Sequence, residues 1–379
     1  MKEYKVIILG CGAAGAMCAL STKEKSVAMI DSNTKVAKKL LATGNGRCNL
    51  TNTNVNSSFY NTNIDKFLKR FDNNQALDFF ERLGLETYAD EEGRVYPISN
   101  SAKSVVDVID AHLQADLFLG AKVKKIIYEN KKFVVTTEKE TFKAAKLVIA
   151  TGGNSKEILS NLGIKFAKFM PSLVALRGKE TRDLNSAKIS NVLVRAENCK
   201  GETKQEVGEV LFKEEGVSGI VIFNLSTLFS RVGDFHGKIS IDLLPKMTEK
   251  ALCEKLSKRR TLCTDTNKLF VGMFVGAVSN EIFKQAKTNI NTPPQKLSDD
   301  DIKSLAKTIK NLQFDVCGAY DNNQVFAGGV PLSDLTDNLE SKKIPNLYFV
   351  GEICDVDGVC GGYNLQWAWT SGHIVGESL

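Results

Sequence analysis

Residues 4–31 read YKVIILGCGAAGAMCALSTKEKSVAMID. The run at 4–9 is short, apolar and β-branched, which is typical of a strand buried on both faces. A glycine-rich turn at 10–15 and a helix of small residues at 16–23 follow it, and a second buried strand at 26–30 ends at Asp31. This order predicts a βαβ unit at the start of the chain.

The turn at 10–15 has the GxGxxG pattern, and Asp31 lies 21 residues after its first glycine, which is the spacing of a dinucleotide-binding motif. Gly10 allows the tight turn, Gly12 lets the backbone approach a pyrophosphate, and Gly15 lets the helix pack closely on the sheet. The free amides and the dipole of the helix N-terminus attract that pyrophosphate. Asp31 can accept hydrogen bonds from ribose hydroxyls and would repel a phosphate, so we expect FAD or NAD rather than NADP.

Two further glycine sites favour FAD over NAD. The ATGG stretch at 150–153 follows a buried strand expected at 145–150, as in the second fingerprint of two-dinucleotide-binding flavoproteins. The NLYFVGE stretch at 346–352 resembles their last fingerprint, in which the acidic residue, here Glu352, holds the ribityl chain of the flavin. Because no second GxGxxG occurs between these sites, NAD(P)H is expected only as a transient co-substrate at the flavin.

The chain of 379 residues is long for one compact domain. Its two ends share the same style of buried strand followed by glycine, so we expect residues 1–171 and 325–379 to form one discontinuous FAD-binding domain. Residues 172–324 are expected to form an insert that is β-rich over 172–246 and mainly helical over 247–324. The pattern also predicts a long helix at 101–119, a hairpin of strands at 123–128 and 133–137, and a capping box at Ser298 and Asp301.

Composition limits the partners. The net charge of +6 comes from scattered lysines, and the cluster at 255–260 is interpreted as a solvated helix face rather than a nucleic-acid patch. The nine cysteines are dispersed and form no C-x-x-C pair, which argues against a disulfide framework and a metal site and favours a reducing cytoplasm. No run reaches the roughly 18 apolar residues that cross a membrane. The oligomeric state is left open.

Several longer motifs make the chain resemble a known family. KKLLATGNGRCNLTN at 38–52, GRVYP at 93–97, GEVLFKEEGVSG at 208–219 and GEICDVDGVCGGYNLQWAWTSG at 351–372 are similar to the BaiN/RdsA-like NAD(P)/FAD-dependent oxidoreductases. This group of bacterial flavoproteins, which includes the YhiN type, is also called the aminoacetone oxidase family. The resemblance implies an α/β fold, with a Rossmann-like FAD-binding domain interrupted by a β-barrel-like and helical insert.

The chain departs from the family pattern at two places. The segment at 154–170 is short and lacks a glycine-rich stretch, and Cys360 stands where threonine is more usual. From the motifs and the resemblance together, the candidate cofactor-binding residues come from four parts of the chain. They are Gly10, Gly12, Ala13, Ala14, Gly15 and Asp31; Lys39, Thr43, Gly44, Asn45, Gly46, Arg47, Cys48 and Asn49; Val123, Thr151 and Gly152; and Gly351, Glu352, Asp355, Gly361, Gly362, Tyr363, Asn364 and Leu365.

Two loops are expected to enclose the isoalloxazine ring. The helix that begins after Gly361 and Gly362 would turn its N-terminal amides toward the pyrimidine end, where negative charge develops on reduction. The loop at 44–49 would form a second wall. Asp355 and Asp357 are each open between flavin contact and turn capping. No catalytic residue is assigned, and Arg47 and Cys48 are the candidates, since a cation beside a thiol favours thiolate.

The leading hypothesis is an FAD-dependent oxidoreductase that uses NAD(P)H to reduce an activated C=C bond, or a related group, of a small-molecule substrate. One alternative is a flavin-dependent oxidase that transfers electrons from a small amine to oxygen. The alternative from another class is a flavoprotein whose insert binds nucleic acid. The chemistry of a flavin requires binding, orientation and electrostatic tuning from the protein, and it requires no catalytic histidine.

Overall fold

The computed structural model describes residues 1–153, 155–179, 181–321 and 325–379. It divides into two compact units, Met1–Met170 with Val325–Leu379 (unit 1) and Pro171–Gln324 (unit 2). The expected architecture is present: unit 1 contains a largely parallel, Rossmann-like sheet, and unit 2 combines a closed barrel with helices.

Unit 1 is built on a seven-stranded sheet in the described residues, with the order β6-β2-β1-β9-β8-β7 and with β18 beside β9. The strands β1, β2, β6, β9 and β18 are parallel neighbours, and β7, β8 and the first half of β9 form an antiparallel meander. The predicted hairpin is confirmed. The strand bounds are β1 Lys2–Leu9, β2 Val27–Asp31, β6 Asp116–Leu119, β7 Val123–Glu129, β8 Lys132–Thr137, β9 Thr141–Ile149 and β18 Leu347–Phe349.

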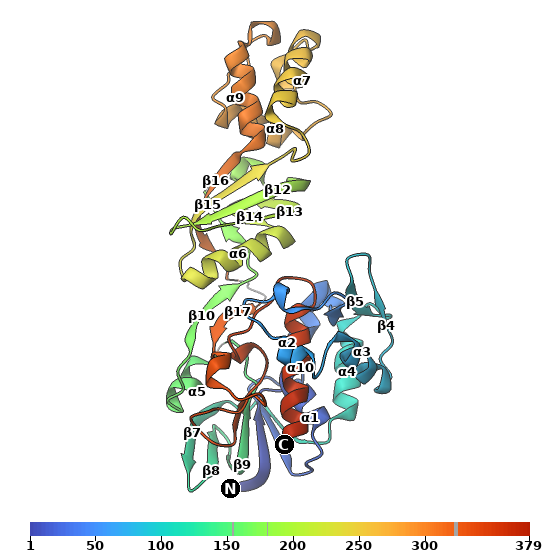
Figure 1. Ribbon diagram of the computed structural model, residues 1–379, viewed down its shortest axis with the longest axis vertical. Helices are drawn as coiled ribbons and strands as arrows, with labels where there is room; N and C mark the ends of the chain where they lie inside the picture. The colour runs from blue at the N-terminus through green and yellow to red at the C-terminus, as the bar shows by residue number, and fades with distance from the viewer. Residues whose placement is uncertain (154, 180, 322–324) are drawn as a thin grey trace. The chain divides into compact units, whose positions relative to one another are not determined.

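Helices α1 (Ala13–Ser21) and α10 (Tyr363–Ser378) pack side by side in unit 1 (Figure 1). Two glycines of α10 make this contact close. A Cβ on Gly372 would lie 2.4 Å from the carbonyl oxygen of Ala14, and a Cβ on Gly376 would lie 2.5 Å from that of Cys18. The last helix of the chain therefore fixes the first, directly behind the GxGxxG turn.

The predicted helix at 101–119 is wrong in its second half. Helix α4 covers Ala102–His112, and the backbone is extended at Leu113. Residues Asp116–Leu119 then form β6, which pairs in parallel with β2. The local sequence favours a helix there, but the edge of β2 offers backbone hydrogen bonds that favour a strand. Because β2 is distant in the sequence, the local pattern of residues 113–119 does not reveal this pairing.

The rest of unit 1 consists of shorter elements. A three-stranded sheet has the order β3-β5-β4, and β10 pairs with β17. The bounds are β3 Thr51–Asn52, β4 Thr87–Ala89, β5 Arg94–Pro97, β10 Ala167–Ser172, β17 Val325–Gly329, α2 Asp65–Leu68, α3 Asn73–Arg82, α5 Lys156–Asn161, and the 3-10 helices η1 Lys38–Gly46, η2 Ser57–Phe59, η6 Leu332–Asp334 and η7 Gly351–Ile353.

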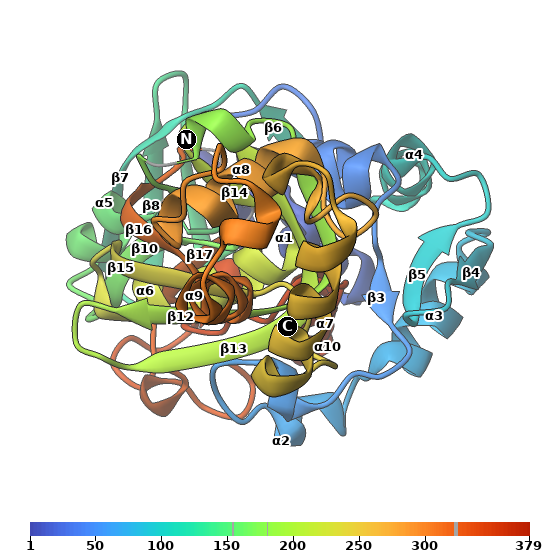
Figure 2. The ribbon, with the colours of Figure 1, turned by 90° about the horizontal axis from the view of Figure 1, so that it is seen from above.

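Unit 2 contains a closed barrel with the order β11-β14-β13-β12-β15-β16. Its helices α7, α8 and α9 lie together beyond the strands (Figures 1 and 2). The bounds are β11 Leu176–Arg177, β12 Lys188–Asn198, β13 Thr203–Lys213, β14 Gly216–Ser218, β15 His236–Asp242, β16 Leu312–Ala319, α6 Ile220–Val232, α7 Glu249–Leu262, α8 Gly276–Gln285, α9 Asp299–Lys310, and the 3-10 helices η3 Arg182–Leu184, η4 Thr266–Lys268 and η5 Pro294–Lys296.

The expected division of the insert into a β-rich and a helical part needs two corrections. Helix α6 lies inside the part expected to be β-rich, between Gly219 and the left-handed cap Gly233. Strand β16 lies inside the part expected to be helical and closes the barrel between β15 and β11. Its alternating burial, with Leu312, Phe314 and Val316 inside, is the period-two signal of a strand. The capping box of Ser298 and Asp301 at the start of α9 is confirmed.

Across the described residues, every helix is too short or too polar to span a bilayer.

Candidate functional site

The glycines of the GxGxxG turn face different surroundings. Gly10 has φ +102°, and a Cβ there would lie 2.4 Å from the carbonyl oxygen of Ala150. A Cβ on Gly15 would lie 2.0 Å from the carbonyl oxygen of Gly10. Gly12 has φ −75°, and a Cβ there would meet no atom within 4 Å. The fold itself requires Gly10 and Gly15, whereas neither backbone strain nor crowding requires glycine at position 12.

Gly12 is also the N-cap of α1, and it gives that helix no side-chain cap. The first turn contains no acidic residue. The amides at 13–15 therefore keep their capacity to bind an anion, supported by the helix dipole. These features fit a diphosphate placed against Gly12.

Asp31 ends β2 and connects the two neighbouring loops. Its Oδ2 accepts a hydrogen bond from the backbone N–H of Cys11 at 2.7 Å, and its Oδ1 accepts from the backbone N–H of Asn33, also at 2.7 Å. Burial, followed by the charge of Asp31, raises the pKa of the Cys11 thiol to about 12. A carboxylate fixed in this way at the carboxyl end of the strand is placed to accept further hydrogen bonds from a sugar.

The C-terminal part of η1 is kinked by a run of left-handed residues. Gly44, Asn45 and Gly46 have φ values of +55°, +56° and +81°. A Cβ on Gly44 would lie 2.7 Å from the backbone nitrogen of Asn49, whereas one on Gly46 would meet nothing within 4 Å. Thr43 Oγ1 donates to the carbonyl of Leu40 at 2.7 Å, so the kink is closed by local hydrogen bonds.

This loop and the loop before α10 form one hydrogen-bonded wall. In the amide orientation that satisfies both of its groups, Asn49 donates to the carbonyl of Thr51 (2.9 Å) and accepts from the N–H of Gly362 (3.1 Å). Asn52 Nδ2 donates to the carbonyl of Gly361 at 3.0 Å. A Cβ on Gly362 would lie only 2.4 Å from the carbonyl oxygen of Thr51. The structure thus brings together two motifs that are more than 300 residues apart.

Two buried side chains of α10 hold the same pair of loops in place. The sequence motifs alone assign them no role. Thr51 Oγ1 donates to Gln366 Oε1 at 2.6 Å, and Trp369 Nε1 donates to the carbonyl of Leu50 at 2.9 Å. Both side chains belong to the NLQWAW stretch, so the sequence signal was present within a motif already singled out. Their contribution is positional, since they fix the two loops to the helix.

The side chains of Tyr363 and Asn364 are used to shape the loop. The Tyr363 ring stacks on Phe59 with centroids 4.4 Å apart. Asn364 accepts from the N–H of Gly358 at 2.9 Å and donates to its carbonyl at 2.8 Å. The N-terminal end of α10 is available to a ligand, because Gly362 provides no side-chain cap there. Leu365 lies half-buried in the first turn of that helix.

The interpretation of Cys48 as a thiol activated by Arg47 is not supported by the geometry. Cys48 is fully buried, and burial raises the pKa of its thiol to about 12. The Arg47 guanidinium instead lies over the ring of Tyr96, 4.3 Å from its centroid, and its Nε donates to the carbonyl of Gly44 at 3.4 Å. Cys48 is therefore a packed residue, while Arg47 retains donors for an anion or a carbonyl oxygen.

Glu352 gathers three partners from separate segments. Its Oε2 pairs with Lys39 at 3.0 Å and accepts from the N–H of Gly153 at 3.4 Å, and its Oε1 accepts from the N–H of Phe326 at 2.7 Å. A Cβ on Gly351 would lie 2.7 Å from the Cβ of Ala14. The Glu352 carboxylate therefore connects η7 with η1, with the loop after β9 and with β17. The sequence carried no signal for the role of Phe326.

The remaining candidates lie at defined positions around these loops. Thr151 Oγ1 hydrogen-bonds Ser155 Oγ at 2.5 Å, and Gly152 takes a left-handed φ of +73°. The backbone N–H of Asp355 donates to the carbonyl of Val330 at 2.8 Å. Val123 begins β7 and is half-buried opposite Thr137.

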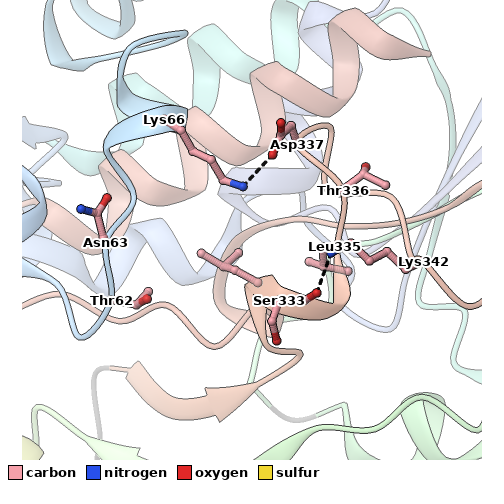
Figure 3. Close-up of a pocket in the computed structure, with 9 residues that line it drawn as sticks. Thr62, Asn63, Lys66, Ser333, Leu335, Thr336, Asp337 and Lys342 are labelled. Carbon is pink, nitrogen blue, oxygen red and sulfur yellow. Dashed lines mark hydrogen bonds and ion pairs between the residues drawn. The ribbon is translucent and has the colours of Figure 1, made fainter.

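A hollow of about 530 Å³ lies elsewhere in unit 1, between residues 62–66 and 332–342 (Figure 3). Lys66 and Asp337 pair across it at 2.6 Å, and Lys342 lies on its other side. None of the candidate cofactor-binding residues lines it. We place the site at the glycine loops instead, because these loops contain the uncapped N-terminal ends of α1 and α10, and Asp31 is hydrogen-bonded to Cys11 in the first of them. In the described residues, no group of three or more His, Cys, Asp or Glu side chains is arranged to hold a metal ion.

The chain is similar to a protein family and to proteins of known activity over nearly its whole length. A model described as the HI0933-like protein Rossmann domain matches residues 4–378. The chain is 30% identical to the 3-dehydro-bile acid delta(4,6)-reductase of Clostridium scindens, covering 99% of this chain and 98% of that protein. It is 28% identical to the ribosomal RNA dihydrouridine synthase of Escherichia coli, covering 100% and 98%. A solved 3-ketosteroid delta1-dehydrogenase from Sterolibacterium denitrificans is similar over 99% of each chain, with 12% identity and a TM-score of 0.47.

Proposed function

Because the chain belongs to the HI0933-like family of Rossmann-domain proteins, we propose that it transfers hydride from NAD(P)H, through bound FAD, to a C=C bond conjugated to a carbonyl group. The family establishes an FAD-dependent oxidoreductase, and the resemblance predicted from the motifs is thereby confirmed. The donor and the acceptor are the proposed part.

The observation that carries the cofactor assignment is Gly12. Its φ of −75° suits any residue and its missing side chain faces open space, so the chain alone gives no reason for glycine. A diphosphate against the uncapped end of α1 does give a reason, because a side chain would occupy the space of its oxygens. Asp31, at the end of the next strand, fits the ribose of the same dinucleotide.

The names of two relatives support the class of acceptor. One is a delta(4,6)-reductase of a 3-dehydro-bile acid, and the other is a dihydrouridine synthase of ribosomal RNA. A double bond in conjugation with a ketone and the C5=C6 bond of a uracil ring share one property, which is that a neighbouring carbonyl makes the bond accept hydride.

Bound FAD supplies the hydride-carrying chemistry, and the chain supplies position and charge. The amides at 13–15 bind the diphosphate, and Asp31 orients the ribose. The N-terminal end of α10, which has no side-chain cap, would stabilise negative charge on the flavin ring through its dipole. Arg47, whose guanidinium has no ion pair among the residues that the structure describes, is the group placed to hold an anionic or carbonyl oxygen of the acceptor.

Anaerobic stopped-flow spectroscopy tests this function. The proposal expects NADH or NADPH to bleach the bound flavin rapidly, and a conjugated enone to restore its colour. Bleaching by a small amine alone, with reoxidation by oxygen, would instead establish the oxidase alternative and overturn the proposal.

A second candidate acceptor is a uridine in RNA. It is favoured by two relatives named ribosomal RNA dihydrouridine synthase, from Escherichia coli and, at 27% identity, from Haemophilus influenzae. Incubation of the holoenzyme and NADPH with ribosomal RNA lacking dihydrouridine, followed by nucleoside mass spectrometry, tests it. The expected product gains two hydrogen atoms on a uridine, and RNA without that product would remove this candidate.

A further inference from the structure

The positive charge of the chain is concentrated in one stretch. Residues 246–311 contain 13 lysines and arginines against 7 aspartates and glutamates, a net charge of +6, which equals that of the whole chain. All other residues together are therefore neutral. The stretch comprises α7, α8, α9 and their connections in unit 2 (Figure 1).

Most acidic residues of this stretch are engaged away from the exposed lysines of α7. Asp299, Asp300 and Asp301 form the first turn of α9, where they complement the positive end of the helix dipole. Asp299 pairs with Arg260 at 2.7 Å, and Asp300 pairs with Lys303 at 3.1 Å. These carboxylates are fixed at one helix end and neutralise cations near it.

Helix α7 carries three lysines on one exposed face. Lys250, Lys255 and Lys258 are exposed, and at about 100° per residue they fall within about 140° of the helix circumference. On the same scale Glu254 lies at about 40°, within this face, and Glu249 lies outside it, so the face carries three lysines against one glutamate. Among the described residues, the ion pairs in this stretch are made by other cations, namely Arg260, Lys268, Lys284, Lys303 and Lys310.

The end of this face also exposes apolar surface. Leu262, the last residue of α7, is 81% exposed, and Val271 and Val275 in the following connection are 63% and 56% exposed. Arg259 fastens this connection to the helix, because its guanidinium donates to the carbonyls of Leu269 and Val271, both at 2.6 Å. Exposed aliphatic groups beside an excess of lysines favour a contact surface over a solvated helix face.

We propose that the exposed face of α7 binds RNA through its backbone phosphates. Lysines that form no ion pair with the described residues can each neutralise a phosphate and release its counterions, and the aliphatic end can contact sugars and bases. This replaces the interpretation of residues 255–260 as a solvated face. The binding does not depend on the flavin, and only the fate of the bound RNA rests on the second candidate function above.

Fluorescence anisotropy with the full-length protein and a labelled oligouridine of about 20 nucleotides tests the proposal, at about 50 mM and about 200 mM salt. The triple variant Lys250→Gln, Lys255→Gln, Lys258→Gln is expected to bind at least about tenfold more weakly at the lower salt. Its log–log salt slope should decrease by about 2, since each phosphate contact to a single strand contributes about 0.7.

The matched control removes three exposed lysines of the β7–β8 hairpin region, Lys122→Gln, Lys125→Gln and Lys131→Gln. It should bind RNA like the unchanged protein. Equal weakening in both triple variants, or no binding by the unchanged protein at the lower salt, would overturn the proposal. Flavin reduction by NAD(P)H should be the same in all three proteins, so that failure of RNA binding and failure of the proposed redox function are read out separately.

Discussion

The segments that follow β1 and β2 each contain a glycine that faces open space, but for different reasons. Gly46, in the loop after β2, has φ +81°, a conformation that glycine adopts without strain. Gly12, in the turn between β1 and α1, has φ −75° and could be any residue as far as the chain is concerned. The backbone conformation thus explains glycine at position 46, whereas glycine at position 12 is explained by the ligand that we propose.

The largest loss of stability is expected at the crowded glycines of the GxGxxG turn, Gly10 and Gly15. In Gly15→Ala, the new Cβ would lie 2.0 Å from the carbonyl oxygen of Gly10, so α1 must move away from the sheet. We expect a loss of about 4 kcal/mol or more in the free energy of unfolding, measured by urea titration. Gly84→Ala is the control, because its Cβ meets nothing within 4 Å and only its positive φ costs about 1 kcal/mol.

The second variant separates ligand binding from stability. Gly12→Asp introduces a preferred N-cap with a negative charge beside the helix dipole, so the free energy of unfolding of the FAD-free protein should stay level or rise by about 1 kcal/mol. The same carboxylate would repel a diphosphate, and the protein should lose FAD. Gly12→Ser, a neutral cap, should weaken FAD binding less. A Gly12→Asp protein that purifies with a full complement of flavin would contradict the role given to this residue.

The third variant tests whether the positive φ of Gly46 is the reason for glycine at this position. Gly46→Ala should cost about 1 kcal/mol, because alanine is strained at a positive φ. Gly46→Asn should cost less, because asparagine tolerates the left-handed region. Thermal unfolding of both variants measures the difference. An equal loss in the two would mean that something other than backbone conformation requires glycine here.

The smallest effect on activity is expected at Cys48. Its buried thiol has a raised pKa of about 12, so Cys48→Ser should leave flavin reduction by NAD(P)H unchanged, and iodoacetamide near neutral pH should label the exposed Cys199 and Cys317 first. Loss of flavin reduction in Cys48→Ser would instead support the hypothesis that Cys48 is a redox-active thiol.

The same pKa predicts a pH effect with a definite sign. A thiol whose pKa is higher in the folded state favours folding below its unfolded pKa of about 8.5, and that contribution is lost as pH rises toward 12. Between pH 9 and 12 the unchanged protein should therefore lose stability more steeply than Cys48→Ala, by up to about 1.4 kcal/mol per pH unit. Parallel curves from urea titrations would contradict the buried position of this thiol.

Local sequence patterns were sufficient for part of this structure. The βαβ unit and the hairpin depend on buried runs and turns that lie within about thirty residues of one another, and both were predicted. Strand β6 was not, because its partner is the edge of β2 and not its own neighbourhood. Helix α6 was missed between two glycines, although its buried Val221, Ile222, Leu225 and Phe229 have helical spacing.

The candidate site also has a part that the sequence predicts and a part that it does not. The glycine loops could be singled out as motifs, since each has its own spacing and residue types. The contacts that join them, such as Asn49 with Gly362 and Glu352 with Phe326, connect residues that no local pattern relates. The burial that makes Cys48 inert is likewise a property of the packed fold, and the adjacent arginine suggested the opposite.

The central claim is that the uncapped end of α1, with Gly12 open beside it, binds the diphosphate of FAD. The most direct measurement is the visible absorption spectrum of the purified protein and of Gly12→Asp, before and after addition of FAD and gel filtration. The account predicts the two bands of an oxidised flavin in the unchanged protein and none in Gly12→Asp, with both proteins folded. A folded, colourless unchanged protein that does not take up FAD would contradict it.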